Sequence, residues 1–122
     1  MNVGDIQKIL KADLICGNED QLEYEVQTAC GSDMMSDVLA FVKNQSVLLT
    51  GLNNPQVVRT AEMMDMRCIV FVRGKTPDSS VIELAKDHDI VILRTGLRMF
   101  TACGLLYSNG LRGGCEKEWV KA

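Results

Sequence analysis

The sequence is poor in aromatic side chains, proline and histidine, and it has no long hydrophobic run. Aromatic residues make up 5% of the 122 residues, and His88 is the single histidine. The longest apolar segments, such as residues 68–72, have the length of a strand, far short of the ~18–20 residues that a membrane helix requires. Residues 1–5 lack the cationic and then apolar pattern of a signal peptide. We therefore expect a cytoplasmic protein with no membrane partner.

Lysine and arginine form no basic run anywhere in the chain. They number 13, against 16 aspartates and glutamates, which leaves a net charge of −3. This balance excludes a general binder of nucleic acid or of membrane surfaces. Apolar residues make up 47% of the chain, enough to build the core of one domain without a disulfide or metal.

The cysteines follow no regular spacing and include no Cys-x-x-Cys pair. They are Cys16, Cys30, Cys68, Cys103 and Cys115. An odd, irregular set is not typical of a disulfide framework, and His88 is not near any of them in the sequence. We expect no metal site and no cofactor, with Cys68 and Cys103 acting as small hydrophobic residues.

The centre of the sequence alternates between apolar strands and amphipathic helices. Apolar segments at residues 47–51, 68–72 and 90–93 are each followed by a helical pattern, the last over residues 97–107. Strands that are apolar on both faces and alternate with helices are typical of parallel βαβ units. We therefore predict a three-layer α/β/α fold with a mainly parallel central sheet of four or five strands.

The N-terminal part adds an amphipathic helix over residues 3–11 and a short strand at residues 13–17. Residues 22–30 alternate between apolar and charged side chains, which predicts a half-exposed strand near a sheet edge. A helix is expected from Met34, capped by Ser32 or Asp33. We assign residues 1–111 to one domain and residues 112–122 to a polar, mobile tail.

The carboxyl ends of the parallel strands are the predicted ligand site. Ligands of open parallel sheets bind beside these ends, where helix N-termini favour anions. The positions that the residues themselves suggest are Thr50, Gly51, Arg73, Lys75, Arg94, Thr95 and, in addition, Arg98. Glycine in such turns also serves backbone geometry alone, and loop cations are often only solvated. Neither G-x-G-x-x-G nor G-x-x-x-x-G-K-[ST] is present, so no phosphate-binding loop supports the prediction.

The last helix has almost no polar face, which predicts that it is covered on all sides. Either the N-terminal helix and the tail cover it, or a second subunit does. We favour a homodimer with Phe100, Cys103, Gly104 and Tyr107 at the interface.

No group of residues suggests catalysis. Asp33 and Asp37 stand four residues apart at a helix start, where aspartates usually cap the helix. His88 lies in a polar turn, and there is no G-x-S-x-G motif. We therefore predict that the chain is not an enzyme and has no catalytic residues.

Three segments together resemble a known family, the DRTGG domain. They are Gly31–Val38, then Leu49–Gly51 with Pro55, and Arg98–Ala102, so the resemblance covers about residues 10–110. The resemblance implies an α/β domain similar to the N-terminal domain of HPr kinase/phosphorylase. It further implies dimerisation, frequent pairing with CBS domains, and no established activity.

The chain departs from the family pattern at two points. Met34 or Met35 stands in place of an arginine, and Leu52 in place of the second glycine. Asp37, Thr50 and Gly51 match the pattern best, and the resemblance adds Asp33 and Asp37 to the candidate ligand-binding residues.

Our leading hypothesis is a homodimeric regulatory domain that senses a small anionic metabolite or nucleotide. The alternatives are an interaction module that binds a protein partner and no small molecule, and an unrecognised phosphate-handling enzyme.

Overall fold

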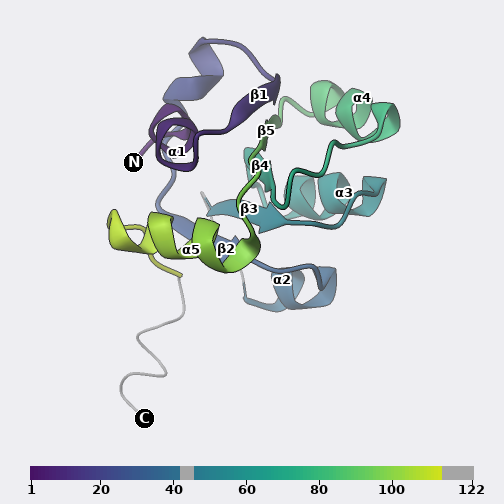
Figure 1. Cartoon of the computed structure of the whole chain (residues 1–122). Coiled ribbons are helices and arrows are strands. Elements are labelled where there is room, and N and C mark those ends of the chain that lie inside the picture. The colour runs from purple at the N-terminus through teal and green to yellow at the C-terminus, as the bar shows by residue number, and fades with distance from the viewer. Residues whose placement is uncertain (42–45, 114–122) are drawn as a thin grey trace.

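The computed structural model describes residues 1–41 and 46–113 (Figure 1). The helices and strands follow in the order α1 (Val3–Leu10), β1 (Asp13–Cys16), η1 (Asp20–Glu23), β2 (Thr28–Gly31), α2 (Met35–Phe41), β3 (Ser46–Thr50), α3 (Pro55–Met63), β4 (Cys68–Phe71), α4 (Ser79–Asp87), β5 (Val91–Arg94) and α5 (Met99–Ser108). None of the helices within these residues is long and apolar enough to span a membrane.

The five strands form one sheet in the order β1-β5-β4-β3-β2. Strands β2 to β5 are parallel, and β1 alone runs antiparallel, against β5. The parallel βαβ units predicted from the three apolar segments are therefore confirmed. Because all four parallel strands point the same way, their carboxyl ends meet at one edge of the sheet.

Helices cover both faces of the sheet, which confirms the three layers. Helices α1 and α5 pack on one face, and α2, α3 and α4 pack on the other (Figure 1). Alternate residues of each strand supply the two cores. The row Leu49, Val70, Leu93 faces α1 and α5, and the row Leu48, Ile69, Ile92 faces the other helices. All six side chains are fully buried, which is why these strands appear continuously apolar in the sequence.

The prediction of a strand over residues 22–30 is wrong for most of that length. The segment begins in the 3-10 helix η1, and only Thr28–Gly31 pairs with β3. Its alternating exposure is real, since Val26 is buried and Glu25 is exposed. However, its backbone forms hydrogen bonds with N-terminal residues instead of with a strand. Tyr24 O accepts a hydrogen bond from Val3 N, and Val26 N donates one to Met1 O. As predicted, β2 lies at an edge of the sheet.

Local sequence signals set several helix starts. Asn2 and Asp5 form a reciprocal capping box at α1. Asn54 accepts a hydrogen bond from Gln56 N, and Pro55 occupies the first turn of α3, where proline is favoured. Beyond α5, Leu111 is buried and Arg112 pairs with Thr28 of β2. Most of the predicted tail, residues 114–122, lies outside the described residues.

Candidate functional site

The carboxylate of Asp33 joins the ends of two neighbouring strands. Asp33 follows β2, and its Oδ1 atom accepts hydrogen bonds from Gly51 N (2.7 Å) and Thr50 Oγ1 (2.9 Å) at the end of β3. Thr50 is fully buried, so this bond satisfies a hydroxyl that has no access to water. We call Asp33, Thr50, Gly51, Arg73 and Lys75 the rim.

Arg73 reaches the same point from the end of β4. Its NH2 atom lies 3.7 Å from Asp33 Oδ2, and both side chains are 47% exposed. The guanidinium occupies the space beside the Gly51 α-carbon, where any Cβ would overlap it. Arg73 has a left-handed backbone (φ 63°), held by a 2.7 Å hydrogen bond from its N–H to Leu97 O. Glycine at position 51 is therefore needed for the observed position of Arg73.

The electrostatics of the rim keep Asp33 charged. The hydrogen bond from Gly51 N is the largest effect and lowers the pKa of Asp33. Burial, the second largest, raises this pKa, but Thr50, Arg73 and Lys75 each lower it further, so that it lies below its usual value. At neutral pH the rim thus contains one anionic carboxylate and two cations, Arg73 and Lys75. Lys75 is exposed in the loop before α4.

Two other predicted site residues have structural partners. Arg94 donates to Asp13 Oδ2 (2.7 Å) on β1 and to Thr76 Oγ1 (2.9 Å). Thr95 is buried, and its hydroxyl donates to Leu10 O at 2.8 Å. Arg94 thus ties the antiparallel edge strand to β5, and Thr95 ties the end of β5 to the end of α1. Asp37 lies exposed in the first turn of α2.

Sequence reasoning missed Asn53, which connects two loops at this edge. Asn53 Oδ1 accepts from Asp78 N (3.0 Å), and its Nδ2 donates to Thr76 O and to Asp78 Oδ1, both at 3.3 Å. Its position before the Asn54-Pro55 helix start suggested only local capping. Asn53 fixes the loop before α4 against the loop before α3.

Helix α5 presents an exposed apolar face. Phe100 is 89% exposed and Tyr107 51% exposed, and a Cβ on Gly104 would meet no other atom. The opposite face buries Ala102 and Leu106 against the sheet and α1. Within residues 1–41 and 46–113, the sheet and α1 cover one side of the helix and leave this face exposed, while most of the predicted tail and a second subunit, the two proposed covers, lie outside what the structure describes.

Cys103 lies between the two faces of α5. It is half-buried, and its Sγ would be 2.6 Å from a Cβ on Gly31. Burial raises the pKa of the Cys103 thiol, and burial raises that of Cys68, which is fully buried, to about 12. Both thiols are therefore protonated at neutral pH, as expected for small hydrophobic residues. Cys115 lies outside the described residues.

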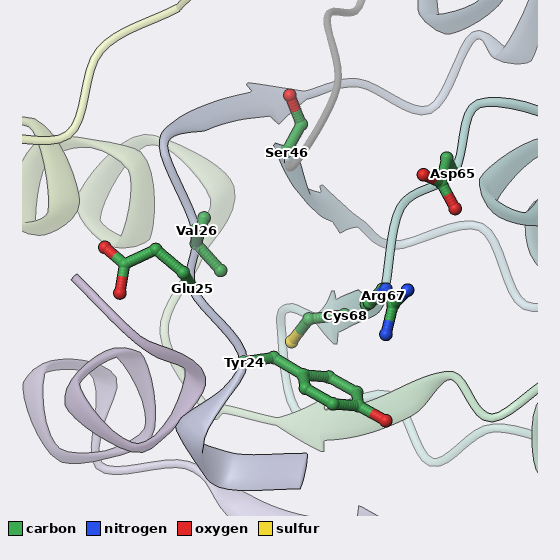
Figure 2. A pocket seen from close by; sticks show the side chains of 7 residues that line it. All are labelled: Tyr24, Glu25, Val26, Ser46, Asp65, Arg67 and Cys68. Atoms are coloured by element: carbon green, nitrogen blue, oxygen red, sulfur yellow. The ribbon is translucent and has the colours of Figure 1, made fainter.

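A hollow at the opposite, amino edge of the sheet surrounds Tyr24 and Arg67 (Figure 2). The Arg67 guanidinium carbon lies 5.0 Å from the centre of the Tyr24 ring, a cation–π distance. Asp65, Ser46 and Cys68 contribute to the wall, and Figure 2 shows Glu25 pointing away from the pair. None of the predicted site residues lines this hollow.

The charged groups of the rim are poorly suited to proton transfer. Its carboxylate is engaged by two donors, and its guanidinium is always charged. General acid–base catalysis needs groups whose pKa values lie near the working pH, and the pKa of Asp33 moves away from neutrality. Helices α3 and α4 start at this edge, so their positive ends add to the attraction for an anion.

Comparison with known proteins places the chain in a family. The model of the DRTGG domain matches residues 5–108. A search of curated proteins gives no match. Among solved structures, the chain is similar to the CBS and DRTGG domains of the regulatory region of Clostridium perfringens pyrophosphatase, in complex with an activator, diadenosine tetraphosphate. The TM-score is 0.72 at 21% identity, over 86% of this chain and 45% of that one, so this chain spans less than half of the crystallised region. Since the family model matches most of its length, the chain belongs to the DRTGG domain family.

Proposed function

We propose that the chain is a non-catalytic regulatory domain that senses a nucleotide or another small anion at the rim, and that it works as a homodimer. The observation that supports the sensing role most is the Arg73 guanidinium, held half-exposed over Gly51 beside a second cation, Lys75. An exposed guanidinium is a good partner for phosphate, because its N–H groups match two phosphate oxygens.

The contact between Arg73 and Asp33 is weak enough for such a ligand to replace it. At 3.7 Å it is longer than a hydrogen bond, and both side chains face water. Exposed pairs of this kind contribute at most about 1 kcal/mol, so a phosphate can replace the carboxylate at little cost. Asp33 keeps its two donors from β3 after Arg73 turns away.

The class of ligand is suggested by the similar crystal structure. The regulatory region of that pyrophosphatase was crystallised with a nucleotide activator. A nucleotide carries phosphates, which suit Arg73 and Lys75. We therefore favour a nucleotide over a simple anion.

Isothermal titration with ATP, diadenosine tetraphosphate and inorganic phosphate tests the sensing role. We expect at least one of the three to bind, and Arg73→Ala to weaken that binding by about tenfold, the loss of one charged hydrogen-bonding partner. Arg59→Ala, which removes an exposed arginine from α3, is the matched control and should bind like the wild type. No binding of any probe, or equal losses in both variants, contradicts the proposal.

The proposed dimer pairs α5 with α5 of a second copy. Phe100 and Tyr107 lie at equal sequence distance on either side of Cys103 and Gly104, on one face of the helix. A two-fold axis through that centre places Phe100 of each copy opposite Tyr107 of the other, with Gly104 open to receive a side chain. Residues Met99–Ser108 include no charged side chain, so two copies meet without burying a charge.

Sedimentation equilibrium tests the dimer. The wild type should dimerise, and Phe100→Glu should be monomeric because it places two carboxylates in an apolar contact. Met63→Glu is the control, since Met63 is a large apolar residue with 68% exposure on α3. A monomeric wild type, or a dimer that Phe100→Glu leaves intact, contradicts this arrangement. A cytoplasmic setting is part of the proposal, and it fits the four free cysteines among the described residues.

A further inference from the structure

We infer that occupation of the rim by an anion and pairing of two chains through α5 are energetically coupled. This inference rests on the proposed function and adds its regulation: the ligand would set the dimerisation constant. Two independent contacts support the inference of coupling. One lies on each side of the Asp33–Arg73 pair, and both involve α5 or the segment that leads into α5.

The first contact holds the turn that carries Arg73. Arg73 N donates to Leu97 O (2.7 Å), and Gly74 N donates to Thr95 O (2.9 Å). Both residues of this turn have left-handed backbones, with φ values of 63° and 68°. Such a conformation is unfavourable for a non-glycine residue, so it depends on those two hydrogen bonds. The segment entering α5 therefore holds the backbone turn from which the guanidinium extends over Gly51.

The second contact lies under the other half of the rim. Cys103 and Met99 of α5 pack on Gly31, whose Cβ, if present, would lie 2.6 Å from Cys103 Sγ and 3.1 Å from Met99 Sδ. Gly31 ends β2, two residues before Asp33, and Ser32 N is fixed to Leu49 O at 3.0 Å. Helix α5 thus sits directly on the strand end that delivers Asp33.

An anion bound to Arg73 therefore acts on a turn that is hydrogen-bonded to the segment entering α5. A shift of this turn reaches α5 because packed side chains leave little free space. The exposed face with Phe100 and Tyr107 belongs to the same short helix, so a shift of α5 also moves this face. The ligand and the second copy consequently act on one element, which is the condition for coupling between two sites.

Sedimentation equilibrium with and without saturating ATP measures the coupling. We expect the dimerisation constant to change by about fivefold or more, the lower end of common coupling strengths. Because such coupling is reciprocal, the monomeric Phe100→Glu variant should bind ATP with an affinity different from that of the wild-type dimer. Met63→Glu is the control and should match the wild type in both measurements.

The outcomes separate this inference from the proposed function. If ATP binds and the chain dimerises, but neither constant responds to the other event, the coupling is refuted and the proposed function stands. If none of ATP, diadenosine tetraphosphate and inorganic phosphate binds, or if no dimer forms, both are refuted. If another of the three probes binds and ATP does not, that probe replaces ATP in both measurements. Met99→Ala supplies a second check, because Met99 contacts Gly31 and is not among the interface residues Phe100, Cys103, Gly104 and Tyr107. It removes a sulfur next to Gly31, so it should reduce the ATP-dependent change in dimerisation, and an unchanged coupling in this variant contradicts the route through Gly31.

Discussion

The guanidinium of Arg73 fills the space that a side chain at position 51 would need, so Gly51 and Arg73 depend on each other. Arg73 comes from the end of β4 and Gly51 from the end of β3, and Asp33 at the end of β2 contacts both. Three strand ends are thereby connected at a point where a phosphate would find two cations and the starts of two helices.

Gly51→Ala is expected to displace Arg73 while leaving the fold intact. Gly51 does not have a positive φ, and the overlapping atoms belong to the end of a flexible side chain. Gly51 is buried, but the three atoms nearest to a Cβ there all belong to Arg73, so the free energy of unfolding should change by about 1 kcal/mol, the usual effect of a point substitution. Binding of the probe that the wild type binds should fall as it does for Arg73→Ala.

Thermal unfolding and calorimetric titration of the Gly51→Ala variant provide the measurement. Gly96→Ala is the control, because a Cβ at Gly96 meets no atom within 4 Å and should alter neither property. A Gly51→Ala protein that binds as the wild type does would show that Arg73 is not needed over Gly51.

The stability supplied by Asp33 should depend on pH. Its pKa in the folded chain lies below 3.8, chiefly because Gly51 N donates to the carboxylate. A lowered pKa means that this contribution is complete above pH 3.8 and disappears as the pH falls through the folded-state pKa. Asp33→Ala should cost about 1–2 kcal/mol at neutral pH, since Thr50 and Gly51 lose a charged acceptor, and less in acid.

Urea unfolding of both proteins across the acid range measures this difference. Asp37→Ala is the control: Asp37 is exposed and makes neither of the hydrogen bonds to Thr50 and Gly51, so its effect should be smaller. A cost of Asp33→Ala that stays constant down to strongly acidic pH would show that the bonds to Thr50 and Gly51 do not require the charged form.

Substitution of Arg94 should affect mainly stability, and substitution of Arg73 should affect mainly ligand binding. Arg94 pairs with Asp13 at 2.7 Å and is one third exposed, so Arg94→Ala should lower the free energy of unfolding by about 0.5–1 kcal/mol. Its effect on ATP binding should be small, whereas Arg73→Ala should show the opposite pattern. Titration and denaturant unfolding of both variants measure this, and a binding loss in Arg94→Ala as large as in Arg73→Ala would restore Arg94 to the ligand site.

Neighbouring leucines in α5 should differ sharply in their cost of truncation. Leu106 is 1% exposed and Leu105 is 36% exposed. Leu106→Ala removes buried methyl groups and should cost about 2–4 kcal/mol, while Leu105→Ala should cost about 1 kcal/mol or less. Both are compared by urea unfolding of the monomeric Phe100→Glu background. Equal costs would mean that α5 is oriented differently on the sheet.

The sequence predicted the layers and the direction of the strands because burial on both faces makes a strand uniformly apolar, as in Leu48 and Leu49. It did not predict how far β2 extends. Residues 24–26 alternate like a strand, yet their hydrogen-bonding partners are Met1 and Val3, which no local pattern reveals.

The candidate site was predicted in its location and only partly in its partners. Strand ends and glycines indicate the carboxyl edge, and the rim does form there. Whether a polar side chain is available to a ligand depends on residues that are distant in sequence. Arg94 donates a hydrogen bond to Asp13, 81 residues away, and Thr95 donates one to Leu10 O. The overlap of Arg73 with position 51 likewise depends on the left-handed backbone at Arg73.

Backbone amide shifts during separate titrations with ATP, diadenosine tetraphosphate and inorganic phosphate test the central claim most directly. With at least one of the three, we expect the resonances of Gly51, Arg73 and Lys75 to move together and saturate at one dissociation constant, and those of Tyr24 and Arg67 at the opposite edge to stay in place. Shifts confined to Tyr24 and Arg67, or no shift at any of these five residues with any of the three probes, would contradict the claim.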